Sequence, residues 1–83
     1  MKTVAVVPVR GIPNAWKVAE PSDPPAPVHE REVALEIQGN PRDGYHLLMS
    51  PAGYFTADTW HEAVEDAKDA AHRLFGVPPE AWA

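Results

Sequence analysis

The chain has 83 residues, a formal net charge of −5 and no cysteine. A chain of this length forms one domain, which buries roughly 60–65% of its unfolded surface. Without cysteine it has no disulfide framework, thiol nucleophile or thiolate metal site. Seven Lys and Arg against twelve Asp and Glu argue against binding of nucleic acid, but the acidic balance suits a basic protein partner.

The first 20 residues predict a β-hairpin. Residues 2–10 are rich in valine, and the apolar run is too short for a signal peptide or a membrane span. We therefore expect a cytoplasmic protein without membrane association. Gly11-Ile12-Pro13-Asn14 is a turn cluster, and residues 15–19 form a second short strand. Pro8 cannot donate to a ladder, which predicts an edge strand or a bulge.

Residues 21–27, PSDPPAP, predict a linker. Four of the seven are proline, so the segment should be extended and polyproline-like, without ladder pairing. Pro21 and Pro24 also match the P-x-x-P pattern of ligands for aromatic grooves. A rigid connector is the favoured interpretation, because such short matches are common.

Residues 31–76 predict three strands followed by a helix. Residues 31–37 alternate apolar and polar side chains, residues 45–49 form the next strand, and residues 54–57 form the third. Turn signals at Asn40–Gly44 and Ser50–Gly53 separate them, so an antiparallel meander is expected.

The helix has a predicted start, face and end. Asp58 and Thr59 are good N-cap types, and Glu62 completes a capping box with Thr59. Gly76 suits a left-handed C-terminal cap that is followed by two prolines. The apolar stripe consists of Trp60, Ala63, Val64, Ala67, Ala71 and Leu74.

The fold class is therefore α+β, with an antiparallel sheet made of the N-terminal hairpin and the meander, packed against one C-terminal helix. One domain comprises the hairpin (1–20), the linker (21–27), the β-β-β-α core (31–76) and a tail (77–83). The tail could form one turn that returns Trp82 to the body. One helix covers only one face of a sheet. The second face is therefore solvated, covered by the hairpin or buried in a homodimer, and of these we expect the homodimer.

Four residues at helical spacing are candidates for metal binding. His61, Glu65, Asp69 and His72 would share one helical face. The His-Glu-x-x-His pattern of zinc enzymes is absent, and a solvated face with an Asp69–Arg73 pair is favoured. We expect no metal and no cofactor.

Catalytic motifs are not evident. Ser22 and Ser50 are the only serines, and each lies next to a proline in a turn. The sequence contains no nucleophile elbow, phosphate loop or dinucleotide fingerprint. Proximity of Ser50 to His46 or His61 stays open, but a non-enzymatic protein is expected.

Seven aromatic residues in so short a chain favour an interaction surface. Trp and Tyr dominate binding hot spots, although aromatic side chains beside a strand are more often core. The sequence predicts a surface at the strand–helix junction, with aromatic anchors and an acidic rim that steers a basic partner. Its members are Tyr54, Trp60, His61, Glu65 and Asp69.

The segment Asp58-Thr59-x-x-Glu62-Ala63, preceded by Pro51-Ala52-Gly53 and a short strand, resembles the core of the HicB antitoxin family. The resemblance covers about residues 31–76. It implies an antitoxin that binds and blocks a small ribonuclease, often as an oligomer. Ala57 stands where that family usually has glycine, and Val77-Pro78-Pro79 replaces the strand expected after the helix.

Overall fold

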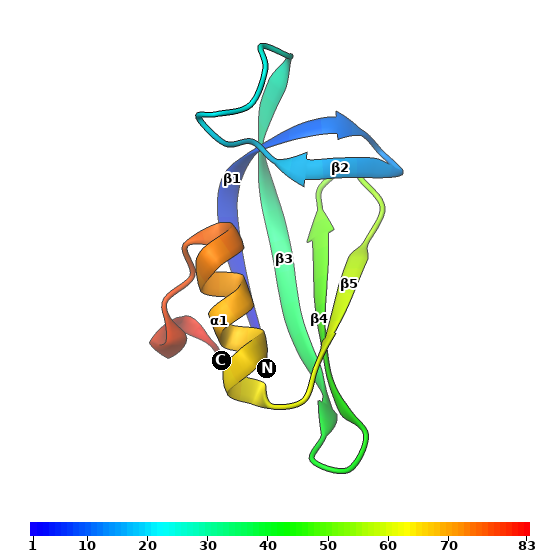
Figure 1. Cartoon of the computed structure of the whole chain (residues 1–83), viewed down its shortest axis with the longest axis vertical. Coiled ribbons are helices and arrows are strands. Elements are labelled where there is room, and N and C mark those ends of the chain that lie inside the picture. Colours follow the sequence, from blue (N-terminus) through cyan, green and yellow to red (C-terminus); the bar gives the residue numbers. More distant parts are fainter.

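In the computed structural model, which describes all 83 residues, five antiparallel strands form one sheet and one α-helix packs on it (Figure 1). The predicted α+β class is confirmed. The helix does not have the length and apolar character that a membrane span requires. The strand order is β2-β1-β3-β4-β5. The elements are β1 (Lys2–Ile12), β2 (Ala15–Val18), β3 (Val28–Asn40), β4 (Gly44–Pro51), β5 (Ala57–His61), α1 (Val64–Phe75) and the 3₁₀-helix η1 (Pro79–Ala81).

The N-terminal hairpin is part of the main sheet, because β1 pairs with β2 on one side and with β3 on the other. β1 as a whole is internal and has no bulge at Pro8, but β2 pairs only with residues 9–12, so at Pro8 the ladder has β3 as its one partner, as at an edge. The Pro8 carbonyl accepts the N–H of Ala19 at 2.9 Å. In an antiparallel ladder both polar groups of a residue face the same neighbour. The missing N–H therefore points toward Ala19, just beyond the end of β2.

The core lies between the sheet and α1. Residues at alternate positions of β1, β3 and β4 point toward the helix, and the largest fully buried ones are Val9, Val33, Leu35 and Leu47. Each such side chain contributes about 1.5–3 kcal/mol on burial. The helix presents three buried alanines and Phe75 to the sheet. Small alanine side chains let the helix backbone approach the strands closely.

The start of the helix differs from the prediction. Residues 57–61, and not 54–57, form the last strand, and α1 begins at Val64 with Ala63 as N-cap and no side-chain cap. Thr59 pairs with Leu47 in the β4–β5 ladder. An N-cap residue and a strand residue both have extended backbones, so the capping pattern suits either structure. The ladder satisfies several backbone groups along β5, whereas a cap satisfies one or two.

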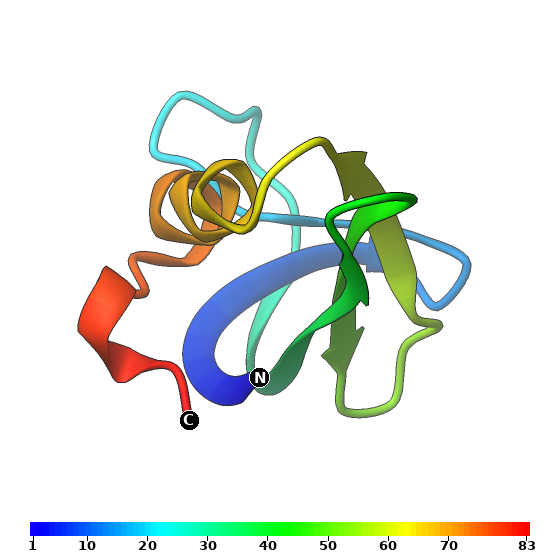
Figure 2. The same ribbon diagram turned by 90° about the horizontal axis from the view of Figure 1, so that it is seen from below.

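The end of the helix is as predicted. Gly76 has φ 72° and donates its N–H to the carbonyl of His72 at 2.9 Å. Val77 folds back and is buried, and Trp82 packs against the core after the short helix η1. The backbones of Lys2 and Ala83 then exchange two hydrogen bonds of 2.9 Å. Figure 2 accordingly shows the two termini close together.

The proline-rich segment 21–27 pairs with no strand but is held at its start by Asp23. The carboxylate accepts the N–H of Glu20 at 2.8 Å and the ammonium of Lys17 at 2.9 Å, and it lies 3.4 Å from Arg10. Arg10 also donates to the carbonyl of Pro24 at 3.0 Å. The Glu20 N–H, followed by the Lys17 ammonium, lowers the pKa of Asp23. The segment therefore begins with a turn and is not polyproline-like throughout.

The sheet curls so that the hairpin tip meets the loop between β4 and β5 (Figure 1). The indole N–H of Trp16 donates to the carbonyl of Phe55 at 2.8 Å, and the N–H of Phe55 donates to the carbonyl of Pro13 at 2.8 Å. These two bonds join segments that lie about 40 positions apart in the chain. They join the hairpin to the β4–β5 loop at one end of the sheet.

Candidate functional site

The five residues of the predicted interaction surface do not form one cluster. Tyr54 lies in the β4–β5 loop and is half-buried against the core, whereas Trp60 and His61 lie at the other end of β5. That loop and the β3–β4 turn are at opposite ends of the sheet (Figure 1). Glu65 and Asp69 are exposed on α1. The predicted strand–helix junction therefore contains His61 and Glu65 but not Tyr54.

Trp60 belongs to a strand and not to the apolar stripe of the helix. It pairs with His46 on the sheet face away from α1, and its side chain is 54% exposed. Its indole N–H donates to the carbonyl of Asp43 at 3.1 Å. A Cβ at Gly44 would collide with the indole ring, so the ring lies directly over this glycine. Trp60 thus supports the β3–β4 turn with one edge while the rest stays exposed.

The predicted helical face of His61, Glu65, Asp69 and His72 is also corrected, because His61 lies in β5. His61 instead contacts the hydroxyl of Thr59, with Nε2 2.7 Å from Oγ1. Neither Asp69 nor its predicted partner Arg73 takes part in any of the five ion pairs. No group of three or more His, Asp or Glu side chains lies close enough together to hold a metal ion.

Ser50 does not contact a histidine. Its hydroxyl lies 2.8 Å from the hydroxyl of Thr56, across the gap between β4 and the β4–β5 loop. His46 pairs instead with Asp58, with Nδ1 3.1 Å from Oδ2, and both side chains are about half exposed. Neither pair has the oriented base beside a hydroxyl that nucleophilic catalysis requires.

The sheet face away from α1 has no cover, and we call it the open face. The hairpin extends the sheet sideways and does not fold over this face, which removes one of the three possibilities set out above. Val4 and Val6 on β1 are 58% and 63% exposed there. The cross-strand registers place these residues on the open face: Lys2, Val4, Val6, Glu32, Ala34, Glu36, Leu48, Ser50, Asp58 and Trp60.

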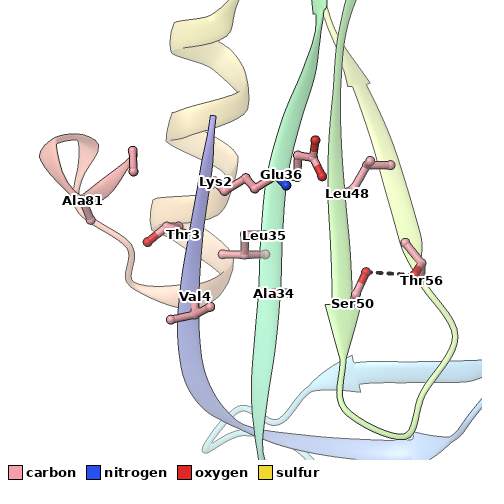
Figure 3. Close-up of a pocket in the computed structure, with 11 residues that line it drawn as sticks. Lys2, Thr3, Val4, Ala34, Leu35, Glu36, Leu48, Ser50, Thr56 and Ala81 are labelled. Atoms are coloured by element: carbon pink, nitrogen blue, oxygen red, sulfur yellow. Dashed lines mark hydrogen bonds between the residues drawn. The ribbon is translucent and has the colours of Figure 1, made fainter.

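A groove of about 570 Å³ runs over the centre of the open face (Figure 3). Ala34 on β3 forms its floor, because its side chain is shorter than those of its cross-strand neighbours Val4 and Ser50. Val4 on β1 and Leu48 on β4 line the two sides. The tail adds Ala81 to the β1 side of the groove.

The open face around the groove carries more negative than positive charge, with Glu32, Glu36 and Asp58 against Lys2. Glu32 and Glu36 flank Ala34 along β3, and neither carboxylate forms an ion pair. Glu36 accepts only the side-chain amide of Gln38, at 2.8 Å. Lys2 is the one cation in the lining, and its side chain extends toward Glu36 in Figure 3. The surface is therefore an apolar floor between two carboxylates: Glu36 has Lys2 as its cross-strand neighbour, and Glu32 has the apolar Val6.

One signal for the open face was present in the sequence. Residues 4–7 are apolar at every position, so β1 is apolar on both faces, as strands covered on both sides are. The alternation of Glu32, Ala34 and Glu36 instead indicated a solvated face. The pairing of β1 with β3 places the apolar residues of β1 beside the alternating residues of β3 on one face, and neither strand's sequence alone indicates this.

Comparison of the chain with protein-family models, with curated proteins and with solved structures gives no match.

Proposed function

We propose that this protein is a non-enzymatic interaction module that binds another protein through the open face of its sheet. The observation that carries the proposal is the exposure of Val4 and Val6 beside a groove on a face that no element of the chain covers. Contiguous exposed apolar surface with a polar border is typical of protein-binding sites.

The layer arrangement supports this use of the face. A sheet with apolar side chains on both faces is stable when both faces are covered, and α1 covers only one. The partner would supply the second layer. The exposed part of Trp60 at the edge of the same face would serve as an aromatic anchor.

Two narrower forms of the proposal follow from the sequence. In one, the second layer is another copy of this chain, so the protein is a homodimer. In the other, the protein is a HicB-like antitoxin that blocks a small basic ribonuclease. The order of β3, β4, β5 and α1 is the β-β-β-α order that the resemblance implies, although Thr59 does not cap the helix. Use as a metal binder has less support, because no suitable group of ligands comes together.

The experiment is an affinity isolation from source cells with three tagged proteins: the wild type, Ala34→Gln and Ala15→Gln. Both alanines are exposed on strands, so neither change should unfold the chain. Ala34→Gln puts a polar side chain into the groove, whereas Ala15→Gln puts the same group on β2, outside the groove lining. Bound proteins are quantified by mass spectrometry.

We expect a protein that is recovered in stoichiometric amount with the wild type and Ala15→Gln and is lost with Ala34→Gln. If the recovered protein is a small basic ribonuclease, the result would support the antitoxin form. A partner retained by Ala34→Gln would show that the open face is not the binding surface, and recovery of no partner would refute the interaction module.

A further inference from the structure

We propose that the groove on the open face binds an amphipathic α-helix of a partner, lying along β3, with Lys or Arg beside its apolar stripe. The inference rests on the proposed function and specifies the chemistry of the partner.

The width of the groove suits a helix. The sides belong to β1 and β4, which are separated by β3 alone. Two strand spacings amount to roughly 9.5 Å, and an α-helix with its side chains is about 10–12 Å across. A helix along β3 would rest on Ala34, and its flanking side chains would contact Val4 and Leu48. Laying an apolar helical stripe into an apolar groove is a common mode of recognition.

The carboxylates beside the groove determine which charged residues the partner helix should carry. Glu32 and Glu36 lie on the same face of β3, each two positions from Ala34 on either side of it, and neither forms an ion pair. A helix resting on Ala34 would place residues about two turns apart next to these two carboxylates, because two turns rise about 10.8 Å and four strand residues span roughly 13 Å. Lys or Arg at those positions would form the missing ion pairs. An acidic helix would be repelled by both carboxylates.

The test uses two fluorescent 14-residue probes of identical composition, seven Leu and seven Lys, and the full-length protein. In the first, Leu recurs at helical spacing, and in the second, Leu and Lys alternate as in a strand. Fluorescence anisotropy gives the affinity of each probe at low and at high salt. We expect the helical probe to bind at least about tenfold more tightly than the alternating probe, and its affinity to fall with salt.

Matched variants locate the binding site. Glu32→Gln/Glu36→Gln removes two charges from the open face on either side of Ala34, and Glu65→Gln/Asp69→Asn removes two charges from the exposed face of α1. Ala34→Gln removes the apolar floor without a change in charge. We expect the groove pair and Ala34→Gln each to weaken binding by about fivefold to tenfold, and the helix pair to leave it within about twofold.

Equal losses from the two charge pairs would mean that net charge alone attracts the probe, and the inference would fail. A loss from the helix pair alone would move the site to Glu65 and Asp69. Tighter binding of the alternating probe would indicate a strand as the occupant. Dimerisation of the wild type that Ala34→Gln abolishes would mean that a second copy occupies the groove. If the affinity isolation yields a groove-dependent partner while the helical probe fails, the proposed function stands and this inference does not.

Discussion

Gly44 shows how one residue can support both a turn and an aromatic side chain. Its φ of 87° lies in the region that glycine adopts without strain, and the indole of Trp60 lies where a Cβ would be. Gly53 has a nearly equal φ of 83°, with no atom within 4 Å of an added Cβ. Substitution of Gly53 therefore tests backbone strain alone, whereas substitution of Gly44 tests strain together with collision against the indole.

We expect Gly53→Ala to lower the free energy of unfolding by about 1–2 kcal/mol, the cost of a left-handed backbone at alanine. Gly44→Ala should cost about 1–3 kcal/mol more, because the indole must also move. Urea unfolding of both variants measures the difference. Adding Trp60→Ala to Gly44→Ala should recover part of the extra loss. Equal losses in the two single variants would show that Trp60 does not lie over Gly44.

Asp23 makes the stability of the linker turn dependent on pH. Its pKa is lowered in the folded state, chiefly by the Glu20 N–H and then by the Lys17 ammonium. A carboxyl group with a lowered folded pKa stabilises the protein above its unfolded pKa of about 3.9, and this contribution disappears as the pH falls through the folded value. The ionised carboxylate is therefore the stabilising form.

The Asp23→Asn variant should consequently have a lower Tm than the wild type at pH 7, and the difference should shrink as the pH falls from about 5 to below 3. Thermal unfolding followed by circular dichroism over that range measures it. Glu30→Gln is the control, because it removes an exposed carboxylate that forms no ion pair. A constant difference at Asp23 across the range would contradict the role of the charge.

At the scale of elements, the sequence predicted those that depend on local signals and failed at the one that depends on a distant partner. Gly76 terminates α1 as expected, because the left-handed cap needs only its neighbours in the chain. Thr59 was assigned to a helix cap because Thr59 and Glu62 match a capping box, but the backbone of an N-cap residue is extended like that of a strand residue. Residues 57–61 form a strand because they pair with β4. No local pattern at Thr59 contains that information.

The substitution Thr59→Val distinguishes a strand from a cap. Valine cannot accept a backbone hydrogen bond, so a capping residue would lose about 1 kcal/mol. In a strand, valine is as favourable as threonine, and we expect a change within about 0.5 kcal/mol, although the contact with His61 is lost. Urea unfolding of the purified variant measures the change. A loss near 1 kcal/mol that Thr59→Ser does not show would favour the cap.

The candidate site is a property of the whole molecule, and for that reason the sequence did not predict it. The five residues chosen from aromatic and acidic patterns lie at both ends of the sheet and on the helix. The groove requires Val4, Ala34 and Leu48 to be neighbours, and these come from three strands. Their adjacency follows from the register of β1 with β3 and of β3 with β4. Alternation within one strand indicates its faces but not its neighbours.

The curl of the sheet also depends on contacts between distant segments. It can be tested by replacing Trp16 and, as a control, Trp82 with phenylalanine. The indole N–H of Trp16 donates to Phe55 and thereby ties the hairpin to the β4–β5 loop. The buried indole N–H of Trp82 has no partner. Phenylalanine retains an aromatic ring and lacks the donor in both places. A hydrogen bond of this kind stabilises by about 0.5–1.5 kcal/mol, whereas an unpaired buried donor destabilises.

We therefore expect Trp16→Phe to lower the free energy of unfolding by about 1 kcal/mol more than Trp82→Phe does. Hydrogen exchange should also speed up locally at the amide of Phe55, which is bonded to Pro13 across the same contact. This second measurement separates loss of the tie from general loss of packing, because Trp82→Phe leaves the tie intact. Faster exchange at Phe55 in Trp82→Phe, or equal losses of stability in the two variants, would show that the Trp16–Phe55 bond does not hold the curl.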